Sequence, residues 1–186
     1  MPEKPLPAHT LAEAHLYLLA TPCATCGRGP LRGVGTVAET TAEPDGPPVL
    51  RIRAKCDTCG AESAPFFRVE QGGRDGDDTA DPVLNATKEP SRLLDIGQWI
   101  TLSKMILEAA DRETDNVQAR RLSIEAGLCL EEALKFYDEP DNDLPPPEAM
   151  FTGPSRERFK VNPQHFSRRR LVGLRARLPT GKRPPN

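Results

Sequence analysis

The chain contains 186 residues, of which 37% are apolar, 20 are proline and 14 are glycine, and its 25 basic and 27 acidic side chains give a net charge of −2. Its uninterrupted apolar runs are far shorter than the roughly 20 residues of a membrane-spanning helix, and the N-terminal segment lacks the apolar core of a secretion signal. The length admits one domain or two small ones and excludes a barrel of about 250 residues. We therefore expect a cytoplasmic protein with a modest core, long connections and no membrane partner.

Residues 10–20 are predicted to form a short amphipathic helix. Thr10 and Glu13 have the spacing of a capping box, in which two side chains satisfy backbone N–H groups at the helix start. Leucines recur at helical spacing through the segment. The predicted helix ends just before the first cysteine pair.

Four of the five cysteines form two C-x-x-C-G motifs, one at residues 23–27 and one at residues 56–60. Each motif can form a tight turn with both sulfurs on one side, and its glycine tolerates the backbone conformation that such a turn requires. Two turns supply four thiolates, the complete tetrahedral ligand set of a structural Zn²⁺. We therefore predict one zinc ion, bound by Cys23, Cys26, Cys56 and Cys59.

Other chemistries of paired cysteines are alternatives to zinc. A thioredoxin-like redox pair needs a βαβ context, which the pattern lacks, and two disulfides need an oxidising compartment. An iron–sulfur centre would use the same four thiolates. The fifth cysteine, Cys129, lies between two leucines in a helical pattern, which is typical of a buried core thiol. A further ligand or a nucleophile is the alternative for Cys129.

The residues between and after the cysteine pairs predict a three-stranded zinc ribbon, which together with the first helix occupies residues 1–71. Strands are expected within residues 31–40, at residues 50–55 and at residues 66–69. Strict alternation in the second strand places Arg51, Arg53 and Lys55 on the outer face of the hairpin. This basic row is either a solvated strand face or a contact for nucleic acid.

Residues 72–90 form an acidic, glycine-containing linker by composition, and residues 91–138 have the pattern of a helical hairpin. Ser91 is the expected cap of a helix that ends near residue 110, and a second helix is expected from about residue 117 to 137. The apolar faces of the two helices are expected to bury each other. Trp99 is interpreted as a core anchor, with a partner-binding surface residue as the alternative.

Residues 139–154 are acidic and then proline-rich, and we interpret them as a stiff connector. Residues 155–186 form a basic tail, because residues 156–186 carry ten basic side chains and one acidic, whereas residues 1–155 carry 15 basic and 26 acidic. A helix is expected from Pro163 to about Arg177. It could dock on the acidic part of its own chain, on an acidic partner protein or on nucleic acid. Its candidate partner-binding residues are Arg168, Arg169, Arg170, Arg175 and Arg177.

Several segments together carry a resemblance to known proteins. They are Ala12–Leu18, the two C-x-x-C-G motifs, Pro90–Trp99, Glu131–Phe136 and Phe166–Leu171. In their order along the chain they resemble a group of uncharacterised bacterial proteins with an N-terminal double-CxxCG zinc ribbon and a helical C-terminal half. The resemblance implies this architecture and a bacterial cytosol, and it implies no activity.

The expected fold class is α+β, with a short helix, the small three-stranded ribbon, the helical hairpin and a basic C-terminal helix. The chain has no G-x-S-x-G, H-E-x-x-H or phosphate-binding loop motif, so we expect no enzymatic activity. The first hypothesis is a non-catalytic adaptor that binds a partner protein, in which zinc replaces the core that a small ribbon cannot build. The alternative is a nucleic-acid-binding protein that uses the basic C-terminal helix and the face of Arg51, Arg53 and Lys55.

Overall fold

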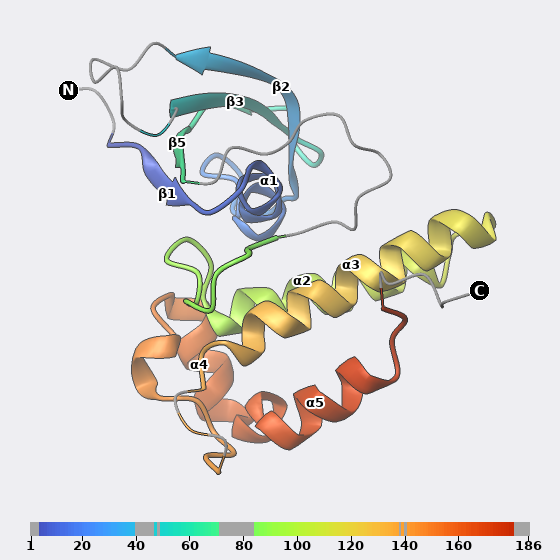
Figure 1. Ribbon diagram of the computed structural model, residues 1–186. Helices are drawn as coiled ribbons and strands as arrows, with labels where there is room; N and C mark the ends of the chain where they lie inside the picture. Colours follow the sequence, from blue (N-terminus) through green and yellow to red (C-terminus); the bar gives the residue numbers. More distant parts are fainter. Residues whose placement is uncertain are drawn as a thin grey trace. The chain divides into compact units, whose positions relative to one another are not determined.

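The computed structural model describes residues 4–39, 47, 49–70, 84–137, 139 and 141–180. For residues 38 and 39 it describes the backbone only. The chain divides into two compact units. Residues 1–78 with 91–93 form one, which we call the sheet unit, and residues 79–90 with 94–186 form the other, the helical unit. The architecture is mixed α+β, as predicted (Figure 1).

The sheet unit is built on one mixed β-sheet. Its strands are β1 (Leu6–Ala8), β2 (Leu31–Glu39), β3 (Val49–Cys56), β4 (Glu62–Ser63) and β5 (Phe66–Val69). Their order is β1-β5-β3-β2, and β4 pairs with β3 beside β5. The β1–β5 pair is parallel, whereas the pairs that β3 makes with β2, β4 and β5 are antiparallel.

The described sheet therefore has five strands, and the prediction of a three-stranded sheet was incomplete. The three expected strands correspond to β2, β3 and β5. The two others span three and two residues, which is too short for an alternating pattern to reveal them. β1 exists because its backbone pairs with β5, with Leu6 opposite Phe67 and Ala8 opposite Val69.

Helix α1 (Leu11–Ala20) packs its apolar residues against one face of the sheet (Figure 1). It begins where predicted, since the Thr10 hydroxyl accepts the Glu13 N–H at 3.2 Å. The alternation in β3 has the predicted effect: Ile52, Ala54 and Cys56 are buried and the residues between them are exposed. The core of the sheet unit joins apolar residues of α1 to those of the strands, among them Ala14, Leu18, Ile52, Phe67 and Val69.

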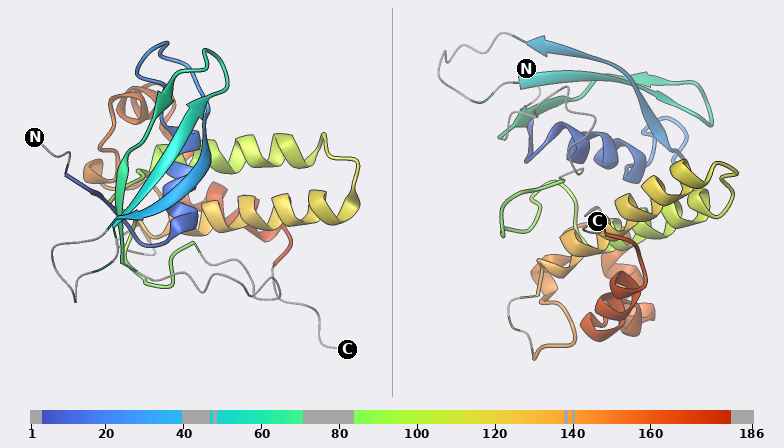
Figure 2. Two further views of the ribbon diagram at one scale, coloured as in Figure 1. Left: turned by 90° about the horizontal axis from the view of Figure 1, so that it is seen from above. Right: turned by 45° about the vertical axis from the view of Figure 1, so that its right-hand side comes forward.

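The helical unit contains the predicted hairpin, formed by α2 (Ile96–Ala110) and α3 (Asn116–Leu134), which lie side by side (Figure 2). The expected cap at Ser91 was wrong by four residues. Asp95 caps α2 in a reciprocal capping box with Gln98, whereas the Ser91 hydroxyl accepts the nearby Leu93 N–H. The signal for the correct start was present in the sequence, because Asp95 and Gln98 have capping-box spacing.

The C-terminal part of the helical unit is broken into short elements. They are η1 (Pro147–Ala149), α4 (Gly153–Val161), η2 (Pro163–Phe166) and α5 (Arg168–Ala176), where η marks a 3₁₀ turn. The single helix expected from Pro163 to Arg177 is therefore divided at Ser167. The extended backbone of Ser167 ends η2, and its hydroxyl accepts the Arg170 N–H to cap α5.

Parts of the two predicted connectors pack within the helical unit. Leu84 and Asn85 are buried, and the ammonium of Lys135 donates to the Asn85 carbonyl at 3.0 Å. Pro145, Ala149 and Met150 are also buried. Residues 72–83 of the predicted acidic linker lie outside the described residues. None of the described helices has the length and hydropathy needed to cross a membrane.

Candidate metal centre

The two C-x-x-C-G motifs form turns with the same backbone hydrogen bonds. The carbonyl of Cys23 accepts the Gly27 N–H at 2.8 Å, and the carbonyl of Cys56 accepts the Gly60 N–H at 2.9 Å. The N–H of each first cysteine donates to the carbonyl five residues later, which belongs to Arg28 in one turn and Ala61 in the other. The turns are therefore two copies of one local structure.

Glycine is required at the fourth position after the first cysteine of each turn. Gly27 has φ +68° and Gly60 has φ +74°, and no non-glycine residue in the described chain has a positive φ. A side chain at such a φ brings Cβ too close to the backbone and costs roughly 1–2 kcal/mol. The two glycines let the backbone of each turn reverse sharply enough to bring the two sulfurs of that turn together.

The four sulfurs form one compact cluster. The Sγ atoms of Cys23 and Cys59 are 3.7 Å apart, and those of Cys26 and Cys56 are 3.8 Å apart. All four Sγ atoms lie within 4.8 Å of one another. Four thiolates at about 2.3 Å from a central Zn²⁺ in a tetrahedron would be about 3.8 Å apart, so the donor set fits a tetrahedral metal ion.

The arrangement does not resemble disulfide chemistry. The five cysteines are free thiols, and sulfurs in a disulfide would be about 2.05 Å apart. The sulfur pairs at 3.7 and 3.8 Å also join different turns, rather than the two cysteines of one C-x-x-C motif. The geometry thus brings together the four cysteines that the sequence analysis selected.

Protein contacts hold the two turns against each other. The first turn follows α1 and leads into β2, and the second joins β3 to β4. The Asp57 N–H donates to the Pro30 carbonyl at 3.1 Å, and the Thr58 hydroxyl donates to the Gly29 carbonyl at 2.8 Å. The guanidinium of Arg32 also pairs with the Asp57 carboxylate. Sequence reasoning missed these three bridging residues, because no motif marks contacts between turns 29 residues apart.

The thiols of the cluster have divergent acidities. Backbone N–H groups of Cys26 and Thr25 lower the pKa of Cys23 to about 6. The Ala61 N–H favours the thiolate of Cys59, but burial and the neighbouring thiols outweigh it and raise the pKa of Cys59 to about 12. Four adjacent thiolates repel one another, so the fully deprotonated set requires a cation at its centre.

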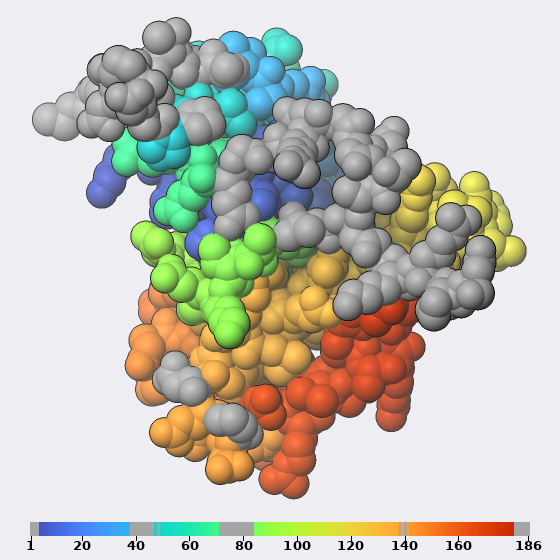
Figure 3. All heavy atoms as spheres, viewed as in Figure 1, coloured from blue at the N-terminus to red at the C-terminus, as the bar shows by residue number. Residues whose placement is uncertain are grey.

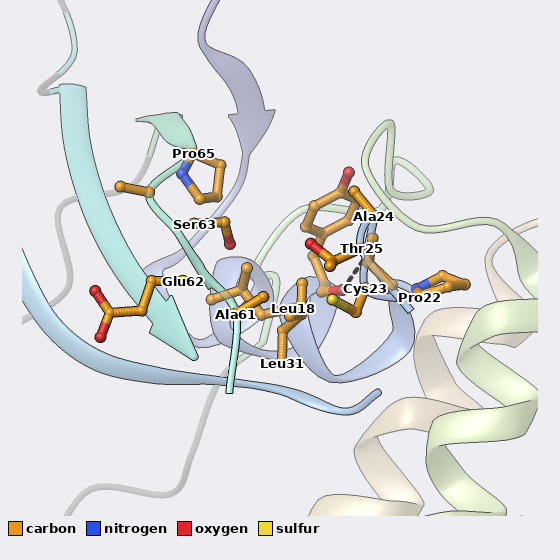
Figure 4. Close-up of a pocket in the computed structure, with 13 residues that line it drawn as sticks. Leu18, Pro22, Cys23, Ala24, Thr25, Leu31, Ala61, Glu62, Ser63 and Pro65 are labelled. Carbon is orange, nitrogen blue, oxygen red and sulfur yellow. Dashed lines mark hydrogen bonds between the residues drawn. The ribbon is translucent and has the colours of Figure 1, made fainter. Parts of the chain in front are cut away.

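A pocket of about 260 Å³ adjoins the first turn. Figure 4 shows Cys23, Ala24 and Thr25 on one side of it and the β4 segment Glu62–Pro65 on the other, with Leu18 and Leu31 at its base. Its lining is mostly apolar, and Cys23 is the cysteine of the cluster that reaches it.

The fifth cysteine is separate from the cluster. Cys129 lies in α3 and is fully buried, which agrees with the interpretation as a core thiol. Burial raises its pKa well above the ordinary value, and the carboxylates of Glu125 and Glu132 raise it further. A thiol held in its neutral form is a poor nucleophile and a poor metal ligand.

The basic strand residues lie where the alternation places them. Arg51, Arg53 and Lys55 are all exposed, on the face of the sheet opposite α1. The Arg51 guanidinium lies 5.2 Å from the centre of the Phe66 ring. Arg53 extends over Gly35 of the neighbouring strand, where an added Cβ would lie 2.9 Å from its Nη2.

The arginines of the C-terminal helix differ in their surroundings. Arg175 lies mostly buried against α3, where its Nη2 is 2.7 Å from a Glu131 carboxylate oxygen, and the space-filling view shows α5 in contact with α3 (Figure 3). Arg169, Arg170 and Arg177 are exposed, and Arg168 is half-buried. Of the three alternatives for the basic helix, Arg175 therefore follows the first, a contact with an acidic residue of its own chain. Trp99 is fully buried in α2 and is a core residue of this structure.

Comparison of the chain with family models, with curated proteins and with solved structures finds no match.

Proposed function

We propose that the protein is a non-catalytic zinc-binding adaptor of the bacterial cytosol, in which one structural Zn²⁺ stabilises a zinc ribbon and other surfaces bind a partner protein. The observation that carries the proposal is the four-cysteine cluster with the sulfur separations of a tetrahedral site. Four protein ligands leave no coordination position for water or substrate, and this is typical of structural rather than catalytic zinc.

The proposed zinc would perform a folding role. The core of the sheet unit combines one ten-residue helix with short strands, and a core of this size stabilises a fold only weakly. A metal ion that binds the folded state and not the unfolded state adds its binding free energy to the stability. Cys23, Cys26, Cys56 and Cys59 would hold the ion between the two turns.

The metal assignment is tested with the purified protein and single Cys→Ser variants. We expect one equivalent of zinc per chain by elemental mass spectrometry, and a loss of that zinc in Cys23→Ser and in Cys56→Ser. Cys129→Ala is the matched control, because this cysteine lies in α3 outside the cluster, and it should retain the full equivalent. Iron and acid-labile sulfide in the wild-type protein would instead identify an iron–sulfur centre, and a metal-free protein of unchanged stability would refute the assignment.

The adaptor role is supported by exposed groups suited to a partner. Val34 and Val37 of β2 are 57% and 50% exposed, and the arginines of β3 and α5 add positive charge. The test is recovery of the tagged protein from native lysate, with and without nuclease and at two salt concentrations. A defined protein partner that resists nuclease and moderate salt supports the adaptor.

Nucleic-acid binding is the second candidate. It is favoured by the exposure of Arg51, Arg53 and Lys55 on one strand face and of Arg169, Arg170 and Arg177 in the tail. Such binding releases counterions and weakens steeply with salt. Recovery of nuclease-sensitive and salt-sensitive material alone would therefore replace the adaptor with this candidate.

A further inference from the structure

A groove of about 530 Å³ lies on the face of the sheet opposite α1. Its walls come from β2, β3 and the β4 segment, and they include Val34, Val37, Arg51, Arg53, Glu62 and Ser63. All of these residues belong to the sheet unit, so the groove is contained in one compact body. Figure 4 shows that the Glu62 carboxylate points away from the pocket beside Cys23. None of the four clustered cysteines lines the groove, although Glu62, Ser63 and Ala64 line both the groove and the pocket beside Cys23.

The two arginines of the groove have uncharged neighbours. Arg51 stacks on the Phe66 ring, and Arg53 lies over Gly35, a position where any larger residue would displace it. Neither guanidinium forms an ion pair with a carboxylate of the described residues. The hydrogen-bond donors of both guanidinium groups are therefore available to a ligand. The ring contact restricts the orientation of Arg51 before binding, which lowers the entropic cost of recognition.

The bulge in β2 adds two aliphatic side chains to the same groove. In a regular strand, Val34 and Val37 would point to opposite faces because they are three residues apart. The register of β2 against β3 shifts between Gly33 and Gly35, and this shift brings both valines to the groove. Each valine is at least half exposed, so about half of its apolar surface is available to a ligand.

We propose that this groove binds an extended segment of a partner protein in which acidic side chains alternate with aliphatic ones. The inference rests on the proposed adaptor function and specifies the chemistry of its partner. Carboxylates would pair with the guanidinium groups of Arg51 and Arg53, where bidentate geometry favours arginine. The aliphatic side chains would cover Val34 and Val37. An extended chain fits because its side chains repeat at the period of the strands that line the groove.

The groove is less suited to nucleic acid. Single-stranded nucleic acids bind by stacking their bases on open aromatic faces. Phe66 supplies a ring here, but Arg51 already covers one of its faces and the ring is half-buried. The exposed valines offer apolar surface without a stacking plane.

The test is a selection of peptides on the full-length protein with its metal as purified. A random decapeptide display library is enriched on the immobilised protein, and the affinities of the selected peptides are then measured by fluorescence anisotropy. We expect sequences with at least two acidic residues interleaved with aliphatic ones. A fluorescein-labelled 12-nucleotide oligo(dT) is measured in parallel as the nucleic-acid probe.

Charge reversal locates the binding site. Arg51→Glu with Arg53→Glu should weaken the selected peptides at least tenfold, because attraction becomes repulsion at two positions. The matched control is Arg120→Glu with Arg121→Glu, a change of the same charge at two exposed residues of α3, and it should leave the affinity unchanged. If the double glutamate variant loses its metal, Arg51→Gln with Arg53→Gln replaces it and should weaken binding at least threefold.

Several outcomes would overturn the proposal. They are the absence of any enriched sequence, enrichment of peptides without acidic residues, equal affinity of the groove variants, and tighter binding of oligo(dT) than of the selected peptides. The adaptor function is judged separately, by recovery of a protein partner from lysate with the same variants. A partner that both the wild-type protein and the groove variants retain would refute the groove while leaving the adaptor standing.

Discussion

Asp95 is a fully buried carboxylate that joins the starts of two helices. Its Oδ1 accepts the Gln98 N–H at 2.9 Å and the Ser155 hydroxyl at 2.7 Å, and its Oδ2 accepts the N–H and the hydroxyl of Thr152. Gln98 lies in the first turn of α2, and Thr152 is the N-cap of α4. The positive ends of both helix dipoles therefore stabilise one charge.

Replacement of Asp95 by Asn should destabilise the helical unit by about 2–4 kcal/mol, because an amide nitrogen would face hydrogen-bond donors in a buried site. Urea denaturation followed by the fluorescence of Trp99 measures the change. Asp111→Asn is the control. It removes the same charge at the exposed end of α2 and should alter the free energy of unfolding by less than about 0.5 kcal/mol. Equal effects of the two variants would contradict the role of Asp95.

Gly97 permits the close approach of α2 and α4. A Cβ atom at this position would lie 2.3 Å from Ser155 Oγ and 2.7 Å from Ser155 Cβ. Gly97→Ala should therefore destabilise the helical unit by about 1–3 kcal/mol, since packed atoms must move apart. Gly153→Ala is the control, because no atom would lie within 4 Å of a Cβ added at this position. Thermal unfolding compares the two, and a neutral Gly97→Ala would show that the contact is not tight in solution.

At the level of elements, α5 shows how a short basic helix becomes part of the fold. Nine residues are too few for a stable isolated helix, so tertiary contacts must hold it. Leu171 is fully buried, and Ser167 at its start donates to the Asp143 carboxylate at 2.8 Å. The Arg169 N–H and the Ser167 hydroxyl hold the pKa of Asp143 below its usual value. This contribution to stability is present at neutral pH and is lost as the pH falls through the native pKa.

Leu171→Ala should destabilise the helical unit by about 2–4 kcal/mol, since it removes a buried side chain and leaves a cavity. The neighbouring Val172 is 43% exposed, and Val172→Ala should change stability by less than about 0.5 kcal/mol. Urea denaturation of both variants measures the difference. If both were neutral, α5 would not be docked on α3 in solution.

One turn structure, which occurs at two places in the chain, forms the four-cysteine cluster. Each turn needs its own cysteines and its own glycine at positive φ, and these requirements are local. The distance between the turns depends on the pairing of β2 with β3, which places Leu31 opposite Cys56. The cluster is thus a product of two local turns and one strand register.

At the scale of the whole molecule, the two compact units should respond differently to removal of the metal. All four clustered cysteines belong to the sheet unit, and the protein's single tryptophan, Trp99, is buried in the helical unit. A strong zinc chelator should therefore lower the unfolding temperature of the sheet unit and leave the thermal transition of Trp99 fluorescence unchanged. Calorimetry and tryptophan fluorescence on the same samples compare the two units. A shift of the Trp99 transition after chelation would show that the units unfold together.

Features that depend on local pattern could be predicted from the sequence. The spacing of the cysteines identified the four residues of the cluster, and alternation identified β3 and its two faces. Helical periodicity identified α1 and the hairpin of α2 and α3. These features are readable because the periods of strands and helices and the geometry of a C-x-x-C-G turn are properties of a few adjacent residues.

Features that depend on distant partners could not be predicted from the sequence and are seen only in the folded chain. β1 is a strand because its backbone pairs with β5. Ser167 interrupts a helical pattern because its hydroxyl donates a hydrogen bond to the Asp143 carboxylate. Asp95 caps α2 through a local capping box, but its link to α4 depends on the donors that Thr152 and Ser155 supply. Such contacts join residues more than 20 positions apart, so no window of sequence contains both partners, and their energies can override local preference.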